Sequence, residues 1–209
     1  AEISKVSSRL LTALRPDVRH YHMPFERFVR EHGPEYAGRV HLVLSNPPYG
    51  ERGAFASEDP SPTYREKTAY AYFMRRALDL LVPGGLGVFI VPSGLLTGER
   101  NRELRARLLA RHHLAAAFRL PSHTPKGREV FPGASVVTDV LFFRARGGEL
   151  TEVDEADRFI LDGKYFEQFP AHILGKTEGA LEGPELGDDD LSPKRPWRYK
   201  IVGDFTRIP

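Results

Sequence analysis

Residues 40–50, which read Val-His-Leu-Val-Leu-Ser-Asn-Pro-Pro-Tyr-Gly, combine a short apolar run with a rigid polar turn. The valine and leucine residues of the run predict a buried strand. Pro47 and Pro48 then remove two backbone donors, and Pro47 forces Asn46 out of the helical region. The turn therefore presents one amide side chain, free carbonyl oxygens and the ring of Tyr49 at a strand's carboxyl end, where open α/β sheets bind their ligands.

This set of groups suits a planar substrate that carries an exocyclic amine. The lone pair of such an amine is delocalised into the ring, which makes the nitrogen a poor nucleophile. The side-chain oxygen of Asn46 and the carbonyl oxygen of Pro47 can each accept one amine N–H, which favours the tetrahedral geometry that frees the lone pair. Tyr49 can stack on the ring face. No charged general base is needed, because the nitrogen can lose its proton after the new bond has formed.

The segment Ser45–Gly50 resembles the catalytic motif of the N6-adenine DNA methyltransferases, which use S-adenosylmethionine (SAM). The resemblance implies that Asn46, Pro47, Pro48 and Tyr49 are catalytic, with Asn46 also against the cofactor. It implies a flipped-out adenine in double-stranded DNA as the substrate. The motif also occurs in methyltransferases that modify protein glutamine or RNA amino groups. A further interpretation, outside enzymes, is a non-catalytic DNA-binding subunit of a modification complex.

Two residues that precede the motif match cofactor positions of this family. Glu2, followed at once by a predicted helix over residues 4–14, is similar to the acidic residue that binds the ribose hydroxyls of SAM. Phe25 corresponds to an aromatic residue beside the cofactor's adenine, although Pro24 stands where an acidic residue is usual. The family's glycine-rich SAM loop is expected upstream of Glu2, on a missing N-terminal segment or on a partner chain. The resemblance therefore implies SAM as the cofactor and a catalytic domain that is incomplete at its N-terminus.

Residues 121–134 resemble the loop with which adenine-specific enzymes hold the flipped base. Phe131, within a Glu-Val-Phe-Pro sequence, corresponds to an aromatic ring that stacks on the base opposite the tyrosine. Lys126 and Arg128 make the same loop basic, and the resemblance implies that they bind the DNA substrate. The strand and Pro-Ser-Gly turn at residues 90–96 also match the DNA adenine branch better than the protein-modifying one.

The elements that must position these residues alternate between helices and strands. Apolar periodicity predicts helices and strands in turn. The predicted elements are a helix over 66–81, a strand over 86–91, a helix over 99–113 and strands over 114–120 and 135–144. A helix followed by a parallel strand, twice over, indicates a doubly wound α/β fold. We therefore predict a Rossmann-like SAM-dependent methyltransferase sheet with a terminal antiparallel strand pair.

The alternating pattern dissolves after residue 146. We assign residues 1–146 to the C-terminal part of a methyltransferase catalytic domain, and residues 147–209 to an irregular extension or a linker to another domain. Residues 164–175 faintly resemble a segment that follows the methylase domain in large helicase-associated DNA methylases. A helicase or specificity module is accordingly an expected partner.

Composition bounds these interpretations. The 209 residues are 41% hydrophobic, which can supply a core, and the net charge of +2 permits nucleic-acid binding without arguing for it. There is no cysteine, so disulfides and thiolate metal sites are excluded, and no metal site is predicted. With no membrane-spanning apolar run and no signal peptide, a cytoplasmic protein without a membrane partner is expected. The densest basic stretch, with five arginines over residues 99–113, is a candidate DNA-backbone contact.

Overall fold

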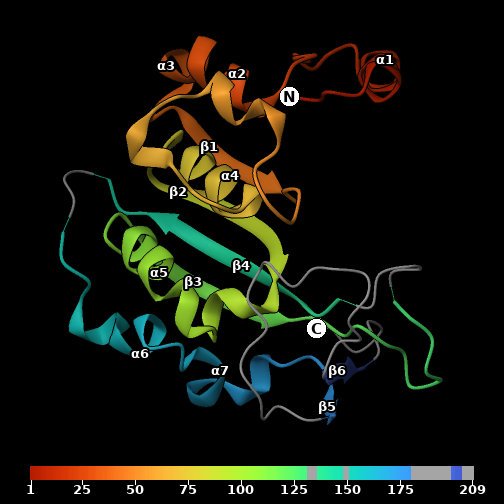
Figure 1. The fold of residues 1–209 in the computed structure, drawn as a ribbon, viewed down its shortest axis with the longest axis vertical. Helices are drawn as coiled ribbons and strands as arrows, with labels where there is room; N and C mark the ends of the chain where they lie inside the picture. The colour runs from red at the N-terminus through yellow and green to blue at the C-terminus, as the bar shows by residue number, and fades with distance from the viewer. Residues whose placement is uncertain (131–135, 148–150, 180–198, 204–209) are drawn as a thin grey trace.

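The computed structural model describes residues 1–130, 136–147, 151–179 and 199–203. Its centre is a four-stranded mixed sheet with the strand order β1-β2-β4-β3. The four strands are β1 (Val40–Ser45), β2 (Leu81–Pro92), β3 (His112–Arg119) and β4 (Thr138–Ala145). In Figure 1 the sheet runs through the middle of the molecule, with β1 towards the top and β3 towards the bottom.

Strands β1 and β2 are parallel and are joined by a crossover through α4 (Ala69–Leu78). The register pairs Ser45 with Phe89, so the turn that follows Ser45 lies beside the last residues of β2. Gly85 allows β2 to bend close to its neighbours, because a Cβ atom there would lie 2.9 Å from the carbonyl oxygen of Val82. Only glycine fits this backbone approach without a shift.

The helix predicted over residues 66–81 is shorter in the structure than its apolar pattern indicates. At its start, Glu51 forms an antiparallel bridge with Thr68, so the residues before Ala69 pair with a loop instead of extending α4. At its end, Leu81 already pairs with Val40 in the sheet. Tertiary pairing has overridden local helix propensity at both ends, and β2 therefore begins before the predicted strand.

Strand β4 is antiparallel to both of its neighbours. Val140 pairs with Ile90 of β2 on one side and with Phe118 of β3 on the other. β4 therefore lies between two strands that precede it in the chain. This order confirms the predicted α/β, Rossmann-like sheet and its terminal antiparallel strand pair.

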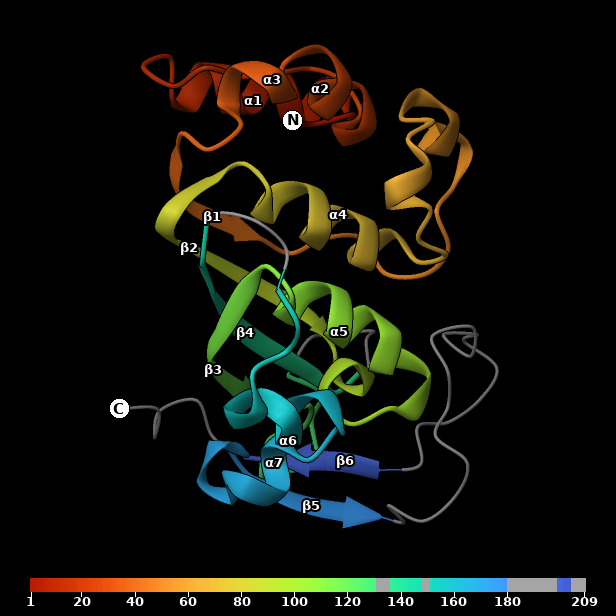
Figure 2. The same ribbon diagram turned by 90° about the vertical axis from the view of Figure 1, so that its left-hand side faces the viewer.

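The hydrophobic core lies between the sheet and two helices, α4 and α5 (Arg102–Leu109), which cover the same face (Figure 2). Phe89 and Leu141 of the sheet are fully buried, as is Met74 of α4, and Leu108 of α5 is only 2% exposed. Burial of this apolar surface stabilises the fold by about 25 cal/mol per Å². α5 is preceded by the short 3₁₀ turns η3 (Ser93–Leu96) and η4 (Glu99–Asn101).

The N-terminal residues form an arm that carries α1 away from the sheet (Figure 1). The arm contains α1 (Lys5–Leu14), α2 (Phe25–Glu31) and α3 (Gly33–Tyr36). α1 confirms the predicted helix, and the Ser4 hydroxyl caps it by accepting a hydrogen bond from the Ser7 N–H at 3.2 Å. The apolar side chains of α1 are exposed. Leu42 and Leu44 of β1 are also exposed, so β1 is not the buried strand that its apolar run predicts.

The C-terminal part packs below the β3 edge of the sheet in Figure 1. Its elements are η5 (Glu155–Asp157), α6 (Arg158–Leu161), α7 (Tyr165–Gln168), η6 (Pro170–His172) and the antiparallel pair β5 (Lys176–Gly179) and β6 (Tyr199–Val202). Ile160 and Phe166 join the main hydrophobic core. The domain boundary predicted after residue 146 stays a prediction. Among the described residues, no helix has the length and apolar character that crossing a membrane requires.

Candidate active site

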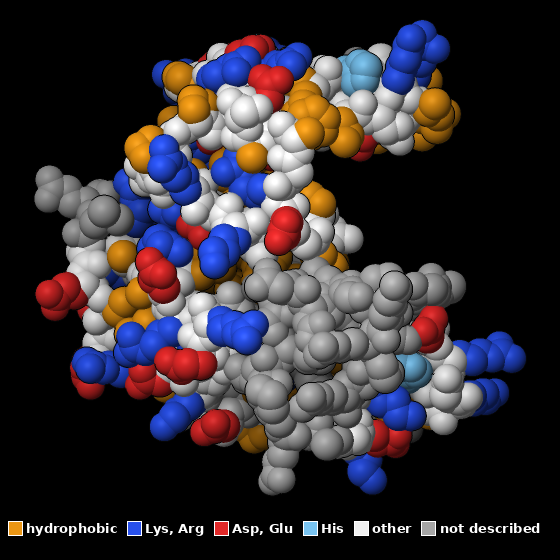
Figure 3. Space-filling model, viewed as in Figure 1, with side chains coloured by type: hydrophobic (Ala, Val, Ile, Leu, Met, Phe, Trp, Pro, Cys, Tyr) orange, Lys and Arg blue, Asp and Glu red, His pale blue; other side chains and the backbone are white. Residues whose placement is uncertain are grey.

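The Asn-Pro-Pro-Tyr turn directly follows the last residue of β1. The side chain of Asn46 is exposed, Pro47 is buried, and Pro48 is exposed. Figure 3 shows that the molecule is hollowed on the side towards which β1 and β2 point in Figure 1, beneath the arm that carries α1. The exposed amide of Asn46, which precedes the buried Pro47, is accessible to a substrate and is held on a restricted backbone.

Tyr49 orients the amide of Asn46. Its hydroxyl donates to Oδ1 of Asn46 at 3.1 Å and lies 3.3 Å from the carbonyl oxygen of Ile90 in β2. Burial raises the pKa of Tyr49 to about 12, so the hydroxyl is a neutral donor at physiological pH and not a base. A side-chain amide oxygen has two lone pairs, so Oδ1 can accept a second hydrogen bond from a substrate amine.

The loop after β2 is held by an ion pair that was not predicted from the sequence. The guanidinium of Arg119 binds both carboxylate oxygens of Asp139, at 2.8 and 3.0 Å, and donates to the carbonyl oxygen of Ser93 at 2.8 Å. Arg119 and Asp139 are 5% and 0% exposed. Ser93 belongs to the Pro-Ser-Gly turn, so a buried charge pair fixes the turn that follows β2. Charged residues at buried strand positions were the available signal in the sequence.

The loop over residues 51–68 is closed at its base, next to the Asn-Pro-Pro-Tyr turn. The N–H of Ala69 donates to the carbonyl of Gly50 at 2.8 Å, and the N–H of Arg52 donates to the carbonyl of Lys67 at 3.0 Å. The last residue of the motif and the first residue of α4 are therefore tied together. The position of the loop relative to Tyr49 is set by these bonds.

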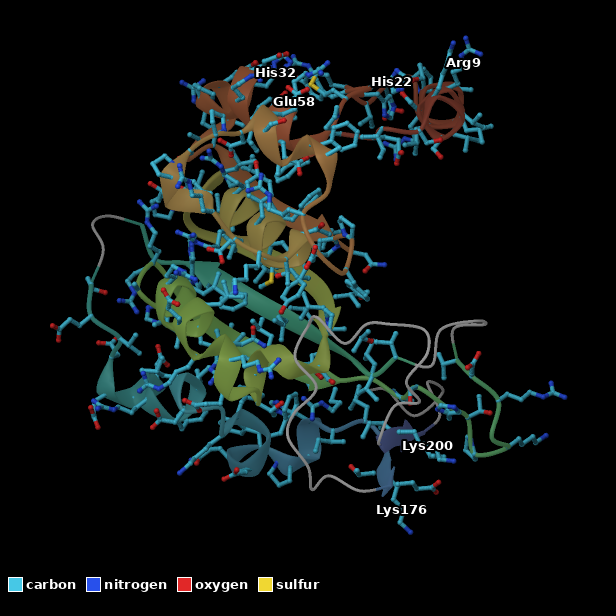
Figure 4. All side chains as sticks on the ribbon, viewed as in Figure 1. Arg9, His22, His32, Glu58, Lys176 and Lys200 are labelled. Atoms are coloured by element: carbon cyan, nitrogen blue, oxygen red, sulfur yellow. The ribbon has the colours of Figure 1, made fainter. Side chains whose placement is uncertain are left out.

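The middle of this loop contains η1 (Ala54–Glu58) and η2 (Pro62–Tyr64) and is fastened to the helices. Glu58, labelled in Figure 4, forms ion pairs with Arg27 at 2.6 Å and Arg30 at 3.0 Å, both from α2. Asp59 is buried and accepts hydrogen bonds from Tyr72 and Arg76 of α4, each at 2.7 Å. The loop is thus fastened to both α2 and α4.

The two predicted cofactor residues lie in the arm and its junction with α4. The N–H of Glu2 donates to the carbonyl of Tyr21, and Oε1 accepts from the N–H of Ser4 at 2.7 Å. The half-buried ring of Phe25 packs against Phe73, with ring centroids 4.6 Å apart. Within the described part of the chain, no hydrogen bond or ring contact joins Glu2 or Phe25 to the Asn-Pro-Pro-Tyr turn, so their cofactor roles stay predictions.

The predicted DNA-binding residues Lys126 and Arg128 lie at the tip of a hairpin in the β3–β4 connection. The N–H of Thr124 donates to the carbonyl of Arg128 at 2.8 Å, and Gly127 has the positive φ of 74° that the tight turn requires. Both basic side chains are exposed. Phe131 lies outside the described residues, so its stacking role stays a prediction.

The arginines of the stretch 99–113 differ from the exposed basic face that the sequence indicates. Arg105 is 1% exposed and donates to the carbonyls of Leu95 and Leu161 at 2.8 and 2.9 Å. Three others form ion pairs with acidic residues outside the helix: Arg102 with Asp162, Arg107 with Glu66, and Arg111 with Asp79. Most of this charge is used within the protein, which weakens the case for a DNA-backbone contact here.

Two features together indicate the class of protein. One is the Asn-Pro-Pro-Tyr turn at the carboxyl end of a parallel strand, and the other is a sheet that ends in an antiparallel pair. The fold is the Rossmann-like fold of the SAM-dependent methyltransferases. Residues 18–124, a little over half of the chain, match the family model described as Eco57I restriction-modification methylase. The chain belongs to the Eco57I restriction-modification methylase family.

Curated relatives are longer than this chain. Defense against restriction protein B of Escherichia phage P1 is 32% identical over 218 residues, which cover 98% of this chain and 9% of that protein. The Type I restriction enzyme EcoKI methylase subunit of Escherichia coli K12 is 31% identical over 108 residues, covering 50% of this chain and 19% of that subunit. The crystal structure of the EcoKI M protein aligns with a TM-score of 0.42 and 26% identity, over 60% of this chain and 24% of that one.

The tyrosine hydroxyl yields a prediction that separates orientation from acid–base chemistry. Tyr49→Phe should keep the ring but lose the hydrogen bond to Asn46. We expect the kcat of methyl transfer to fall about five- to tenfold, which corresponds to the free energy of one neutral hydrogen bond. Because the pKa of Tyr49 is raised to about 12, the wild-type rate should not change through deprotonation of Tyr49 as the pH rises to 10. Steady-state kinetics across pH 6–10 would measure both. An alkaline limb that is present in the wild type and absent from Tyr49→Phe would contradict this role.

Proposed function

We propose that this chain supplies the catalytic turn of a SAM-dependent DNA methyltransferase that acts on adenine N6. The observation that carries the proposal is the exposed Asn46 amide, held at the carboxyl end of β1 by the Tyr49 hydroxyl at 3.1 Å. Among the described residues, Oδ1 of Asn46 accepts the bond from Tyr49 alone, so its second lone pair and the carbonyl of Pro47 are two acceptors from adjacent residues. Two adjacent acceptors match the two N–H groups of an exocyclic amine.

The residues of the turn act by holding and orienting the amine. With one N–H bonded to Asn46 and the other to Pro47, the N6 nitrogen of adenine becomes tetrahedral, its N–H bonds turn out of the ring plane, and its lone pair is no longer delocalised into the ring. SAM, when bound, supplies an electrophilic methyl group carried on a sulfonium. Tyr49 stacks on the base and remains protonated, so the surplus proton of the methylated nitrogen leaves to water and not to a side chain of the turn.

The cofactor would be held in part by the residues that the sequence resemblance indicates. Oε1 of Glu2 is bonded to the N–H of Ser4, and among the described residues no hydrogen bond occupies its second carboxylate oxygen, which suits a ribose hydroxyl. The half-exposed ring of Phe25 suits an adenine edge. The glycine-rich loop that binds the methionine end would come from a preceding segment or from a partner chain.

Double-stranded DNA is the proposed substrate, with the target adenine flipped out of the helix. Membership of a restriction-modification methylase family supports DNA, and the exposed Lys126 and Arg128 suit its phosphates. Phe131 would stack on the base opposite Tyr49 and so offset the few kcal/mol that flipping costs. A helicase or specificity module would supply sequence recognition, in keeping with the relative named as a Type I methylase subunit.

The test is to identify the methylated product. The intact protein would be incubated with methyl-labelled SAM and duplex DNA, and the DNA hydrolysed for mass spectrometry. We expect N6-methyladenine, together with increased fluorescence when 2-aminopurine replaces the target adenine. Label found only in N4-methylcytosine, in RNA or in protein glutamine would overturn the assignment. Catalytically silent protein that still binds the duplex would favour a DNA-binding subunit.

A further inference from the structure

A pocket of about 430 Å³ lies within the loop over residues 51–68, which follows the Asn-Pro-Pro-Tyr turn in the chain. Five charged residues line it, together with Ala56 and Pro60. They are Arg52, Asp59, Arg65, Glu66 and Lys67. These residues give no signal in the sequence, because basic and acidic side chains are nearly balanced in the loop. The structure separates the two signs by giving the acidic residues other partners.

Both carboxylates of the pocket are already neutralised. Asp59 is paired with Arg76 at 2.6 Å. Burial opposes ionisation of Asp59, but the bonds from Arg76 and Tyr72 outweigh burial and hold its pKa below the usual range. Glu66 forms ion pairs with Arg75 and with Arg107, the latter at 3.3 Å. Neither carboxylate is left to balance the basic side chains on the pocket wall.

The three basic residues of the pocket have no such partners. Arg52 stacks its guanidinium on the ring of Tyr72 at 3.7 Å and donates to the carbonyls of Tyr64 and Ala56. Arg65 and Lys67 are exposed. In the ranges that the structure describes, none of these three cations forms an ion pair. The pocket therefore carries uncompensated positive charge, with one rigidly held guanidinium and two exposed side chains beside it.

The loop that carries the pocket begins directly after the turn proposed to bind the substrate amine. Arg52 follows Tyr49 by three residues, so their Cα atoms are at most about 11 Å apart. The bond from the N–H of Arg52 to the carbonyl of Lys67 keeps Lys67 opposite Arg52 at the base of the loop. The basic side chains of the pocket therefore lie on the loop that directly continues the turn proposed to hold the modified nucleotide.

We propose that the pocket lined by Arg52, Arg65 and Lys67 binds a backbone phosphate of the nucleic acid strand next to the nucleotide being modified. This inference rests on the proposed function and deepens it, because it assigns a phosphate site to the loop that follows the catalytic turn. Arginine and lysine together suit a phosphodiester, since one supplies a planar fork and the other a mobile point charge. The contact would fix the register of the strand without reading its sequence.

The first test is the salt dependence of DNA binding by the intact protein. The double variant Arg65→Gln/Lys67→Gln should bind a duplex roughly tenfold more weakly at moderate salt, and its log–log slope against salt should be shallower by about 0.9 for the lost phosphate contact. SAM affinity should be unchanged, because none of these residues is proposed to touch the cofactor. Lys176→Gln, at an exposed position far from the site in Figure 4, is the matched control and should behave as wild type. Unchanged affinity and slope in the double variant would overturn the inference.

The second test locates the phosphate. Uncharged methylphosphonates would replace, one at a time, the phosphates that flank the target adenine of a duplex that the wild type methylates. At one position the methylphosphonate should weaken wild-type binding more than it weakens binding of the double variant, because the variant has already lost two of the three side chains proposed to contact that phosphate. Equal losses in both proteins at every position would overturn the inference. If the wild type methylates no adenine, the proposed function fails instead. The salt dependence of binding to the same duplex, compared between the wild type and the double variant, still tests the phosphate site.

Discussion

Asn46→Ala in the intact protein should lower kcat for methyl transfer about 10²–10³-fold, which corresponds to roughly 3–4 kcal/mol for one lost transition-state acceptor. The amide oxygen of Asn46 is one of the two proposed acceptors for the substrate amine, and alanine leaves the lone pair of that amine delocalised. SAM affinity should change little. Rapid-quench single-turnover kinetics would measure the chemical step directly. A variant that keeps a third of the wild-type rate in that step would exclude the proposed role.

The fold should tolerate this change. Asn46 is exposed, and the Tyr49 hydroxyl that donates to its side chain can donate to the carbonyl of Ile90 instead. The denaturation midpoint of Asn46→Ala should therefore match that of the wild type. Ser45→Ala, one residue earlier in the chain, is the matched control and should retain turnover. Loss of activity in both variants, or a lowered midpoint in Asn46→Ala, would indicate that the turn was disrupted and not merely deprived of an acceptor.

Asp139→Ala should destabilise the protein by about 3–5 kcal/mol, because it leaves the guanidinium of Arg119 buried without its counter-ion. The pair is almost fully buried, with two hydrogen bonds at 2.8 and 3.0 Å. Denaturant unfolding of the intact protein would measure the change. The double variant Arg119→Met/Asp139→Leu should recover most of the lost stability, since it removes both charges and fills the space with apolar atoms.

Two comparisons sharpen this prediction. Asp17→Asn removes one partner of the solvent-exposed pair between Arg15 and Asp17, whose side chains are 63% and 62% exposed, and should leave the denaturation midpoint unchanged. The recovered double variant should still turn over more slowly than wild type, because a thioether in place of the Arg119 guanidinium cannot donate to the carbonyl of Ser93 beside the catalytic turn. If the losses in free energy of unfolding from single substitutions at Asp139 and at Arg119 simply added in the double variant, the two side chains would not be coupled as this prediction requires.

The sequence by itself determined the features that depend on neighbouring residues. The prolines at 47 and 48 restrict their own φ angles and the backbone of Asn46, so the rigid turn after β1 follows from local sterics. The helix over residues 4–14, with Ser4 as its cap, follows from apolar periodicity and a side-chain hydrogen bond within one turn. The alternation of helices and strands likewise predicted the class of fold.

The tertiary structure decided which of several similar charged side chains are available to bind a ligand and which are used within the protein. Five arginines of residues 99–113 look alike in the sequence, but Arg105 is buried against carbonyls that include that of Leu161, 56 residues later. Arg65 and Lys67 gain a binding surface only because Asp59 and Glu66 are paired with helices that follow the loop. These choices depend on contacts between residues distant in the chain, and such contacts form only when the whole hydrophobic core is packed.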